Sequence, residues 1–211
     1  MKNVDILFED DDCFILNKPA GLAVQGGEGV GTSLDDLLAA EFSPRPLLVH
    51  RLDKDTSGVI LVAKHREAAS YFAKIIEERD ILKIYNAICN GTPNPESGII
   101  SLDIEAKGTK KKSETMYKTL FTKDDFSFLE LELGTGRMHQ IRKHLASIGH
   151  PILGDDKYGN FAVNKAYKKA GGAKKLFLHA RTLKIPQRNG KTIEASAPLP
   201  EYWEAFTPRT H

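Results

Sequence analysis

The stretch over residues 47–63 most limits what this chain can fold into, because two apolar runs enclose a segment that is crowded with charge. The runs, residues 47–49 and 59–63, have the aliphatic and β-branched composition that is typical of buried strands. Between them lie five charged or titratable side chains: His50, Arg51, Asp53, Lys54 and Asp55. Charges are rarely buried without a partner, so we expect this segment to surface at a sheet edge or to line a cleft.

Other strand-like segments follow along the chain without a βαβα rhythm. We expect strands at residues 6–8, 14–17, 82–89, 98–104, 114–120, 127–133, 176–180 and 192–197. Helices are expected at residues 66–78 and 139–148, in a short segment capped by Thr32 or Ser33, and around Trp203. The pattern predicts an α+β fold with a largely antiparallel mixed sheet and flanking helices, in a single domain over residues 1–211.

Composition excludes several classes of protein. No apolar run approaches the roughly 20 residues that cross a bilayer. The opening segment is acidic, whereas a secretory signal is basic and then apolar, so we expect a cytoplasmic protein. Cys13 and Cys89 show neither a paired nor a metal-binding spacing, and we expect both thiols to lie in the core.

The charges are unevenly distributed along the chain. The first 41 residues hold nine acidic side chains and only two lysines, so the remainder is net positive. Much of the positive charge lies in residues 107–112, expected at an exposed hairpin tip, and in residues 165–175, neither of which has a strong apolar face. One such patch is commonly a solvated loop, but two favour a polyanionic partner. The candidate contacts to a nucleic-acid backbone are Lys107, Lys110, Lys111, Lys112, Lys165, Lys168 and Lys169.

Within residues 50–58, HRLDKDTSG, Asp53 lies beside Arg51 and Lys54. Neighbouring cations lower the pKa of a carboxyl group and keep it ionised. An ionised and oriented carboxylate can act as a nucleophile or as a base. The alternative is that an aspartate here only caps the turn. The density of charge argues that one of Asp53 and Asp55 has another role, but the remaining aspartate can still be a turn cap.

The second cluster lies in residues 136–159, GRMHQIRKHLASIGHPILGDDKYG. A helix with Ile141, Leu145 and Ile148 toward the core would project His139, Arg142 and Lys143 from another arc, near its N-terminal end. The three histidines, His139, His144 and His150, are spaced by five and six residues, which does not favour a metal site.

The third cluster is KIYNAICNG, residues 83–91. Strand alternation puts Lys83 and Tyr85 on one face and Ile84 and Ile88 on the other. Tyr85 is then either a half-exposed packing residue or a ring that is offered to a planar ligand.

Together with LHART, residues 178–182, these motifs resemble in order and spacing the RluA-type pseudouridine synthases, whose signature is H-R-L-D-x-x-T-S-G. The resemblance runs from about residue 4 to residue 206. Two departures are visible: Met138 stands where the family more often has a small hydroxyl residue, and Arg181 follows LHA where many members differ. Neither departure touches the signature aspartate, tyrosine or arginine.

The resemblance implies that uridine in RNA is flipped out and isomerised to pseudouridine without cofactor or metal. The N-glycosidic bond breaks, the uracil turns while bound, and its C5 joins the ribose C1′. Asp53 would be the catalytic carboxylate, Tyr85 would pack on the base, and Arg142 would pair with Asp53. Arg51 would fill the gap left by the flipped uridine, which would offset part of the unstacking cost. The implied substrate-binding residues are His50, Arg51, Leu52, Thr56, Lys83, Arg137, His139, Gln140 and Ile141.

We therefore expect a monomeric catalytic domain that binds a ribosomal or transfer RNA stem-loop in a central cleft, away from membranes. Many relatives carry an additional N-terminal S4 domain, and we expect none here, so target choice would depend on the loops of the catalytic domain or on RNA shape. The sequence leaves open which uridine is modified. It also leaves open whether Asp53 first attacks C1′ or first acts as a base on the ribose.

Two alternatives belong to other classes. Residues 53–56 also read DxDxT, the nucleophile motif of haloacid-dehalogenase-type phosphatases, and Asp155 and Asp156 could supply their magnesium ligands. That fold needs repeated βα units, which the pattern lacks. A non-catalytic RNA-binding module is the other alternative, and the complete set of Asp53, Tyr85 and Arg142 argues against it.

Overall fold

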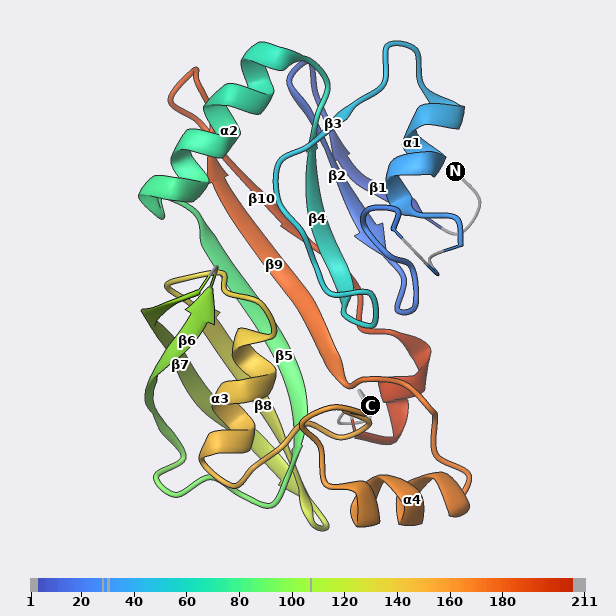
Figure 1. Ribbon diagram of the computed structural model, residues 1–211, viewed down its shortest axis with the longest axis vertical. Coiled ribbons are helices and arrows are strands. Elements are labelled where there is room, and N and C mark those ends of the chain that lie inside the picture. The colour runs from blue at the N-terminus through green and yellow to red at the C-terminus, as the bar shows by residue number, and fades with distance from the viewer. Residues whose placement is uncertain (1–3, 28, 30, 107, 207–211) are drawn as a thin grey trace, which may run out of the picture. The chain divides into compact units, whose positions relative to one another are not determined.

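The computed structural model describes residues 4–27, 29, 31–106 and 108–206, and the chain forms two compact units (Figure 1). Unit 1 comprises Met1–Lys83 and Ala180–Pro198. Unit 2 comprises Ile84–His179 and Leu199–His211. Each unit is thus assembled from segments that are far apart in the sequence.

The sheet of unit 1 has the strand order β1-β2-β4-β9-β10, and β3 also pairs with β4. The pairs β1–β2, β2–β4, β3–β4 and β9–β10 are antiparallel. Every residue of β4 is buried, as its apolar run predicts, whereas the short β3 is only half-buried. The strands are β1 (Asp5–Glu9), β2 (Cys13–Lys18), β3 (Leu47–Leu48), β4 (Ser57–Ala63), β9 (Leu178–Pro186, whose first two residues belong to unit 2) and β10 (Thr192–Ser196).

Two helices of unit 1 begin at side-chain caps. Ser33 caps α1 (Leu34–Glu41), where its hydroxyl accepts from the backbone N–H of Asp36 at 3.2 Å. The helix α2 (Arg66–Glu78) has the predicted bounds, and its buried face includes Phe72 and Ile75. An apolar stripe at helical spacing is therefore enough to place α2.

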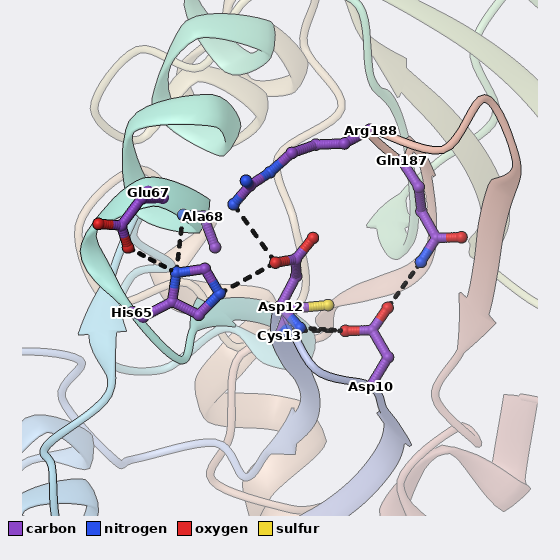
Figure 2. Close-up of polar contacts among 8 residues, drawn as sticks. All are labelled: Asp10, Asp12, Cys13, His65, Glu67, Ala68, Gln187 and Arg188. Atoms are coloured by element: carbon purple, nitrogen blue, oxygen red, sulfur yellow. Dashed lines mark hydrogen bonds and ion pairs between the residues drawn. The ribbon is translucent and has the colours of Figure 1, made fainter.

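A polar cluster ties the β1–β2 turn to α2 and to the β9–β10 turn (Figure 2). One oxygen of Asp10 accepts from the backbone N–H of Cys13 at 2.8 Å, and the other accepts from Nε2 of Gln187 at 2.6 Å. The carboxylate of Asp12 lies 3.0 Å from Nε2 of His65 and 3.3 Å from Nη2 of Arg188. Part of the acidic charge near the N-terminus therefore stabilises the fold of unit 1.

Unit 2 has the strand order β5-β8-β7-β6, with antiparallel pairing throughout. Its strands are β5 (Leu82–Asn90, whose first two residues belong to unit 1), β6 (Ser97–Ala106), β7 (Thr109–Lys123) and β8 (Phe126–Leu133). Helix α3 (Gln140–Ser147) packs against β6 and β7. The 3₁₀ helix η1 (Glu201–Phe206) brings Trp203 within 5.5 Å of Phe177, ring centre to ring centre, in an aromatic core. The expected α+β fold with a largely antiparallel sheet is confirmed.

Three local expectations are wrong. Lys110, Lys111 and Lys112 lie within β7 rather than at a hairpin tip, and Lys107 lies outside the described residues. Residues 161–169, where no helix was predicted, form α4 (Phe161–Lys169). Ile148 is the C-cap of α3 and is 37% exposed, so it does not face the core. Cys13 and Cys89 are both fully buried, as expected.

Candidate active site

The segment that carries Asp53 joins the short β3 to the buried β4. Leu52, Thr56 and Ser57 are buried, whereas the side chain of Asp53 is half-exposed between them. The backbone N–H of Thr56 donates to the carbonyl oxygen of Asp53 at 3.1 Å, which closes a tight turn. The turn places the half-exposed Asp53 between the short β3 and the start of the buried β4.

Gly58 explains why the signature ends in glycine. Its φ of 108° lies in a region that side chains disfavour. A Cβ at this position would lie 2.1 Å from the carbonyl oxygen of Ala180 in the neighbouring β9. Close approach of β9 therefore requires glycine immediately after the turn of Asp53.

Lys18 is a site residue that the sequence reasoning missed. Its side chain is fully buried, and Nζ donates to the carbonyl oxygens of Pro19 at 3.0 Å, Leu22 at 2.8 Å and Lys54 at 3.0 Å. The backbone N–H of Gly21 donates to the same carbonyl of Lys54 at 2.9 Å. Lys18 thereby joins the loop after β2 to the loop of Asp53. The readable signal was a lysine at the end of an apolar strand, directly before Pro-Ala-Gly.

The charge of Lys18 is coupled to the candidate carboxylates. Burial lowers the pKa of Lys18 to about 8, although the carboxylates of Asp55 and Asp53 act in the opposite direction. The ammonium of Lys18 and the carboxylates of Asp55 and Asp53 therefore attract one another. The sequence predicted Arg51 and Lys54 as the cations near Asp53, and the structure adds the buried Lys18. Arg51 and Lys54 are both exposed.

His50, an expected substrate contact, is turned toward the backbone of β4. Its Nε2 accepts from the backbone N–H of Leu61 at 2.9 Å. Burial and the nearby charge of Lys83 lower the pKa of His50 to about 4, so the ring is neutral at neutral pH. Burial and the charge of Arg79 lower the pKa of Lys83.

In unit 2, Arg142 forms a two-pronged ion pair with Asp155. Its Nε donates to Oδ2 and its Nη2 to Oδ1, each at 2.8 Å, and both side chains are buried. Burial alone would raise the pKa of Asp155, but Arg142 and the backbone N–H groups of Tyr158 and Lys157 outweigh it and hold the pKa below its usual value. The sequence predicts that Arg142 projects from a different arc than Ile141 and Leu145, and the structure shows that Arg142 is nevertheless buried, because Asp155 binds it in the interior.

The loop of Asp155 is shaped by close contacts on both sides. A Cβ on Gly154 would lie 1.9 Å from the carbonyl oxygen of Lys175, and one on Gly159 would lie 2.1 Å from that of Asp155. Asn164 of α4 accepts from the backbone N–H of Gly154 and donates to the carbonyl oxygen of Asp155, both at 2.9 Å. Helix α4 therefore fixes the carboxylate that orients Arg142.

Tyr158 adds an aromatic wall beside this ion pair. Its hydroxyl lies 3.1 Å from Nδ1 of His139, and the guanidinium of Arg142 lies 5.3 Å from the centre of its ring. His139 has a left-handed φ of 54° as the N-cap of α3. The structure thus brings together His139 and Arg142, which the sequence predicted, with Asp155 and Tyr158, which it did not assign to this site.

Gln140 holds the loop before α3. Its Oε1 accepts from Oγ1 of Thr135 at 2.7 Å and from the backbone N–H of Arg137 at 3.0 Å. Its Nε2 donates to the carbonyl oxygen of Glu114 in β7 at 2.8 Å. Ile141 is buried beside it. The side chain of Gln140 thus places the backbone of Arg137, and contact of Gln140 and Ile141 with substrate stays a prediction.

Tyr85 is 9% exposed, and its backbone is paired with Leu131 of β8. Tyr85 and Arg142 belong to unit 2, whereas Asp53 belongs to unit 1. The pairing of Asp53 with Arg142, the packing of Tyr85 on a base and the central cleft stay predictions.

The three histidines of the second cluster have separate surroundings. His139 contacts Tyr158, Nε2 of His144 lies 3.0 Å from Oγ of Ser113, and Nδ1 of His150 lies 3.0 Å from the carbonyl oxygen of Asn90. Burial lowers the pKa of His144 to about 4. In the part of the chain that the structure describes, no group of three His, Cys, Asp or Glu side chains is arranged to hold a metal ion, and no helix is long and apolar enough to span a membrane.

Comparison with known proteins supports the same assignment. The family model for RNA pseudouridylate synthase matches residues 12–147. Ribosomal large subunit pseudouridine synthase C of Rickettsia felis is 38% identical over 218 residues, which cover 94% of this chain and 68% of the relative. The protein of the same name from Vibrio cholerae is 36% identical over 211 residues, covering 94% of this chain and 67% of the relative.

A solved structure shows the likeness in three dimensions. Human RNA pseudouridylate synthase domain containing 4 superposes with a TM-score of 0.80 and 26% identity, covering 94% of this chain and 89% of that chain. The resemblance in the sequence is therefore confirmed, and the phosphatase alternative is set aside, since Asp155 binds Arg142. Because the family model covers the loop of Asp53 and all of α3, and the similarity extends over nearly the whole chain, this chain belongs to the RNA pseudouridylate synthase family and is a pseudouridine synthase.

Proposed function

We propose that this enzyme converts specific uridines of large-subunit ribosomal RNA to pseudouridine, with Asp53 as the essential carboxylate. The observation that carries the proposal is the turn at Asp53, which is joined to the loop after β2 by the buried ammonium of Lys18. The choice of RNA rests on the names of the Rickettsia felis and Vibrio cholerae relatives, which are ribosomal large subunit synthases.

The proposed chemistry is an isomerisation, so every atom of the uridine is retained. The bond between N1 and C1′ breaks, the uracil turns, and a new bond joins C5 to C1′, after which the proton on C5 is lost and N1 gains one. A carboxylate of Asp53 can attack C1′ as a nucleophile or remove a proton from the ribose as a base. Either role needs a carboxylate that is held in place, and Lys18 ties the loop of Asp53 to the loop after β2.

Access to the uridine requires that it leave its stack, at a cost of a few kcal/mol. In our proposal Tyr85 stacks on the flipped uracil, and Arg51, which is exposed, fills the vacated space. Arg142, held by Asp155, would pair with Asp53 and keep its carboxylate oriented. We further propose that the enzyme acts as a monomer in the cytoplasm and needs neither metal nor cofactor.

The decisive experiment maps pseudouridine in total RNA from cells that lack the gene, and from the same cells complemented with wild type or with Asp53→Asn. The proposal expects one or more sites in large-subunit ribosomal RNA to disappear, to return with wild type and to stay absent with the variant. Loss of sites only from transfer RNA would contradict the choice of substrate. Return of the sites with Asp53→Asn would contradict the role of the carboxylate.

A further inference from the structure

Helix α4 carries an unusual combination of side chains on its solvent-facing surface. Phe161, Lys165, Lys168 and Lys169 are all exposed, and Phe161 is 65% exposed. At 3.6 residues per turn, these four positions fall within an arc of roughly 100°. We call these four residues the α4 face. Figure 1 shows α4 as the orange helix at the bottom of the view.

The opposite side of α4 explains why the helix is held in place. Asn164 contacts the backbone of Gly154 and of Asp155, both at 2.9 Å. The ring of Tyr167 lies 5.7 Å from that of Phe206 and 5.8 Å from that of Phe177, centre to centre. The inner side therefore belongs to the core of unit 2, whereas nothing in the packing of unit 2 accounts for the α4 face.

The positive charge of the α4 face is uncompensated. Residues 157–175 contain six lysines and no acidic residue. No carboxylate among the described residues forms an ion pair with Lys165, Lys168 or Lys169. The ammonium of Lys174 approaches Lys168 closely enough to lower the pKa of Lys168. Like charges brought together in this way gain from a bound anion.

The charge of the other basic patch, residues 107–112, is compensated where the structure shows Lys112. Lys112 forms an ion pair of 2.8 Å with Glu114, and the same carboxylate raises the pKa of Lys112. Its cross-strand neighbour in β6 is Asp103, a further acid. The charge of Lys112 in β7 is therefore compensated inside the protein, and that of α4 is not.

An exposed aromatic ring among lysines fits an unpaired stretch of nucleic acid. Bases of any identity can stack on an aromatic side chain, while lysines follow the phosphates. Lysines at positions i, i+3 and i+4 of a helix lie about 5–6 Å apart and can contact neighbouring phosphates. A solvated helix face would need the lysines but not a largely exposed phenylalanine.

We propose that the α4 face is an RNA-binding surface, on which Lys165, Lys168 and Lys169 contact phosphates and Phe161 stacks on an unpaired base. This inference rests on the proposed function, because it takes the partner to be the substrate RNA. The surface adds affinity that is independent of sequence, and it lies on the helix that fixes Asp155.

The test uses the full chain with Asp53→Asn, so that binding is measured without turnover. The probes are a labelled single-stranded RNA of mixed sequence and a duplex of the same length. Removing three phosphate contacts with Lys165→Ala, Lys168→Ala and Lys169→Ala should flatten the log–log salt dependence of binding by about 0.7 per contact on the single strand. Raising the salt from 50 to 200 mM weakens binding of the parent, and the factor by which it weakens binding of the triple variant should be about 20-fold smaller.

Phe161→Ala should show the complementary behaviour. Loss of stacking lowers affinity for the single strand by about fivefold or more, with the salt slope unchanged and little effect on the duplex. Phe161→Tyr should restore binding, and Phe161→Leu, which is apolar but not aromatic, should not.

The matched control removes three lysines from unit 1, Lys74→Ala, Lys184→Ala and Lys191→Ala, and should leave the salt slope as in the parent. If the α4 lysine variant and the control give parallel slopes, or if Phe161→Ala binds the single strand as the parent does, the inference is wrong. These readouts do not depend on catalysis. Failure of wild type to form pseudouridine would overturn the proposed function alone, because the binding comparison would still decide the role of the α4 face.

Discussion

Arg142 and Asp155 form a two-pronged ion pair, with Nε to Oδ2 and Nη2 to Oδ1 both at 2.8 Å, in the interior of unit 2. The same Nη2 also lies 3.2 Å from Oδ1 of Asp156, whose side chain is 85% exposed. Two adjacent carboxylates thus contact one guanidinium, and the carboxylate of Asp155 is buried whereas that of Asp156 is exposed. Asp155→Ala and Asp156→Ala therefore form a matched pair of variants.

The first prediction concerns this pair. Asp155→Ala removes the buried carboxylate of the pair while the guanidinium stays buried, a change that costs about 3–5 kcal/mol in comparable pairs. Asp156→Ala removes an exposed contact and should change the free energy of unfolding by about 1 kcal/mol or less. Urea denaturation of the two variants measures the difference. Equal losses would show that burial does not govern the contribution of these carboxylates.

Lys18→Met tests whether a buried lysine shapes the catalytic loop. The change keeps much of the side-chain volume but removes the ammonium that donates to the carbonyl oxygens of Pro19, Leu22 and Lys54. We expect kcat to fall at least tenfold, because the carboxylate of Asp53 loses both its nearby cation and its fixed loop. Lys64→Met removes a lysine at the other end of the sheet and serves as the control. Steady-state kinetics in which both variants match wild type would contradict the role of Lys18.

The pH dependence of activity should reflect Lys18. Its pKa is lowered to about 8 from 10.5, so above pH 8 a neutral amine with two N–H groups faces three carbonyl acceptors. We expect kcat/KM of wild type to decline as pH rises through about 8. Lys18→Met should lack that decline. A pH profile with the same alkaline limb in both proteins would assign the limb to another group.

Stability should move in the opposite direction with pH. Between about pH 8 and 10.5 the unfolded chain retains a proton that folded Lys18 has released. The destabilising effect of the buried charge is therefore relieved as pH rises through this window. The measurement is the free energy of unfolding of wild type and of Lys18→Met at both ends of the window. Relative to Lys18→Met, wild type should be more stable at the alkaline end than at pH 8.

Gly58→Ala should be poorly tolerated. The new Cβ would lie 2.1 Å from the carbonyl oxygen of Ala180, and the backbone has a φ of 108°. Gly21→Ala is the control, since Gly21 also has a positive φ, of 90°, but its Cβ would meet no atom within 4 Å. We expect a loss of about 1–2 kcal/mol for Gly21→Ala, from backbone strain alone, and a clearly larger loss for Gly58→Ala. Thermal unfolding that ranks the two variants in reverse order would contradict the close approach of β9.

The sequence predicted those parts of the fold that depend on local pattern. The β1–β2 hairpin and the bounds of α2 follow from alternation and from an apolar stripe, which the structure preserves. The turn of Asp53 was also predictable, because charged side chains between two buried strands must reach the surface or a partner. Helix α4 was missed although Asn160 offers a readable N-cap and its Ala and Lys residues favour helices.

Contacts between distant segments could not be predicted in the same way. Lys18 is buried because three carbonyl groups from two loops converge on it, and no local pattern reports that convergence. The burial of Arg142 was not predicted, because helical periodicity does not show the loop of Asp155 that binds it. In both cases the partner is supplied by tertiary structure, which decides whether a charge is buried.

The central claim is that Asp53 performs the chemistry, and Asp55, two residues away in the same turn, is its matched control. The measurement is pseudouridine formation in a large-subunit ribosomal RNA transcript under single-turnover conditions, with RNA affinity measured in parallel. Asp53→Asn should abolish product while affinity stays within a few-fold, because the amide keeps the shape but not the charge. Asp55→Asn should retain activity within about tenfold. Product formation by Asp53→Asn at a rate near that of wild type would contradict the account.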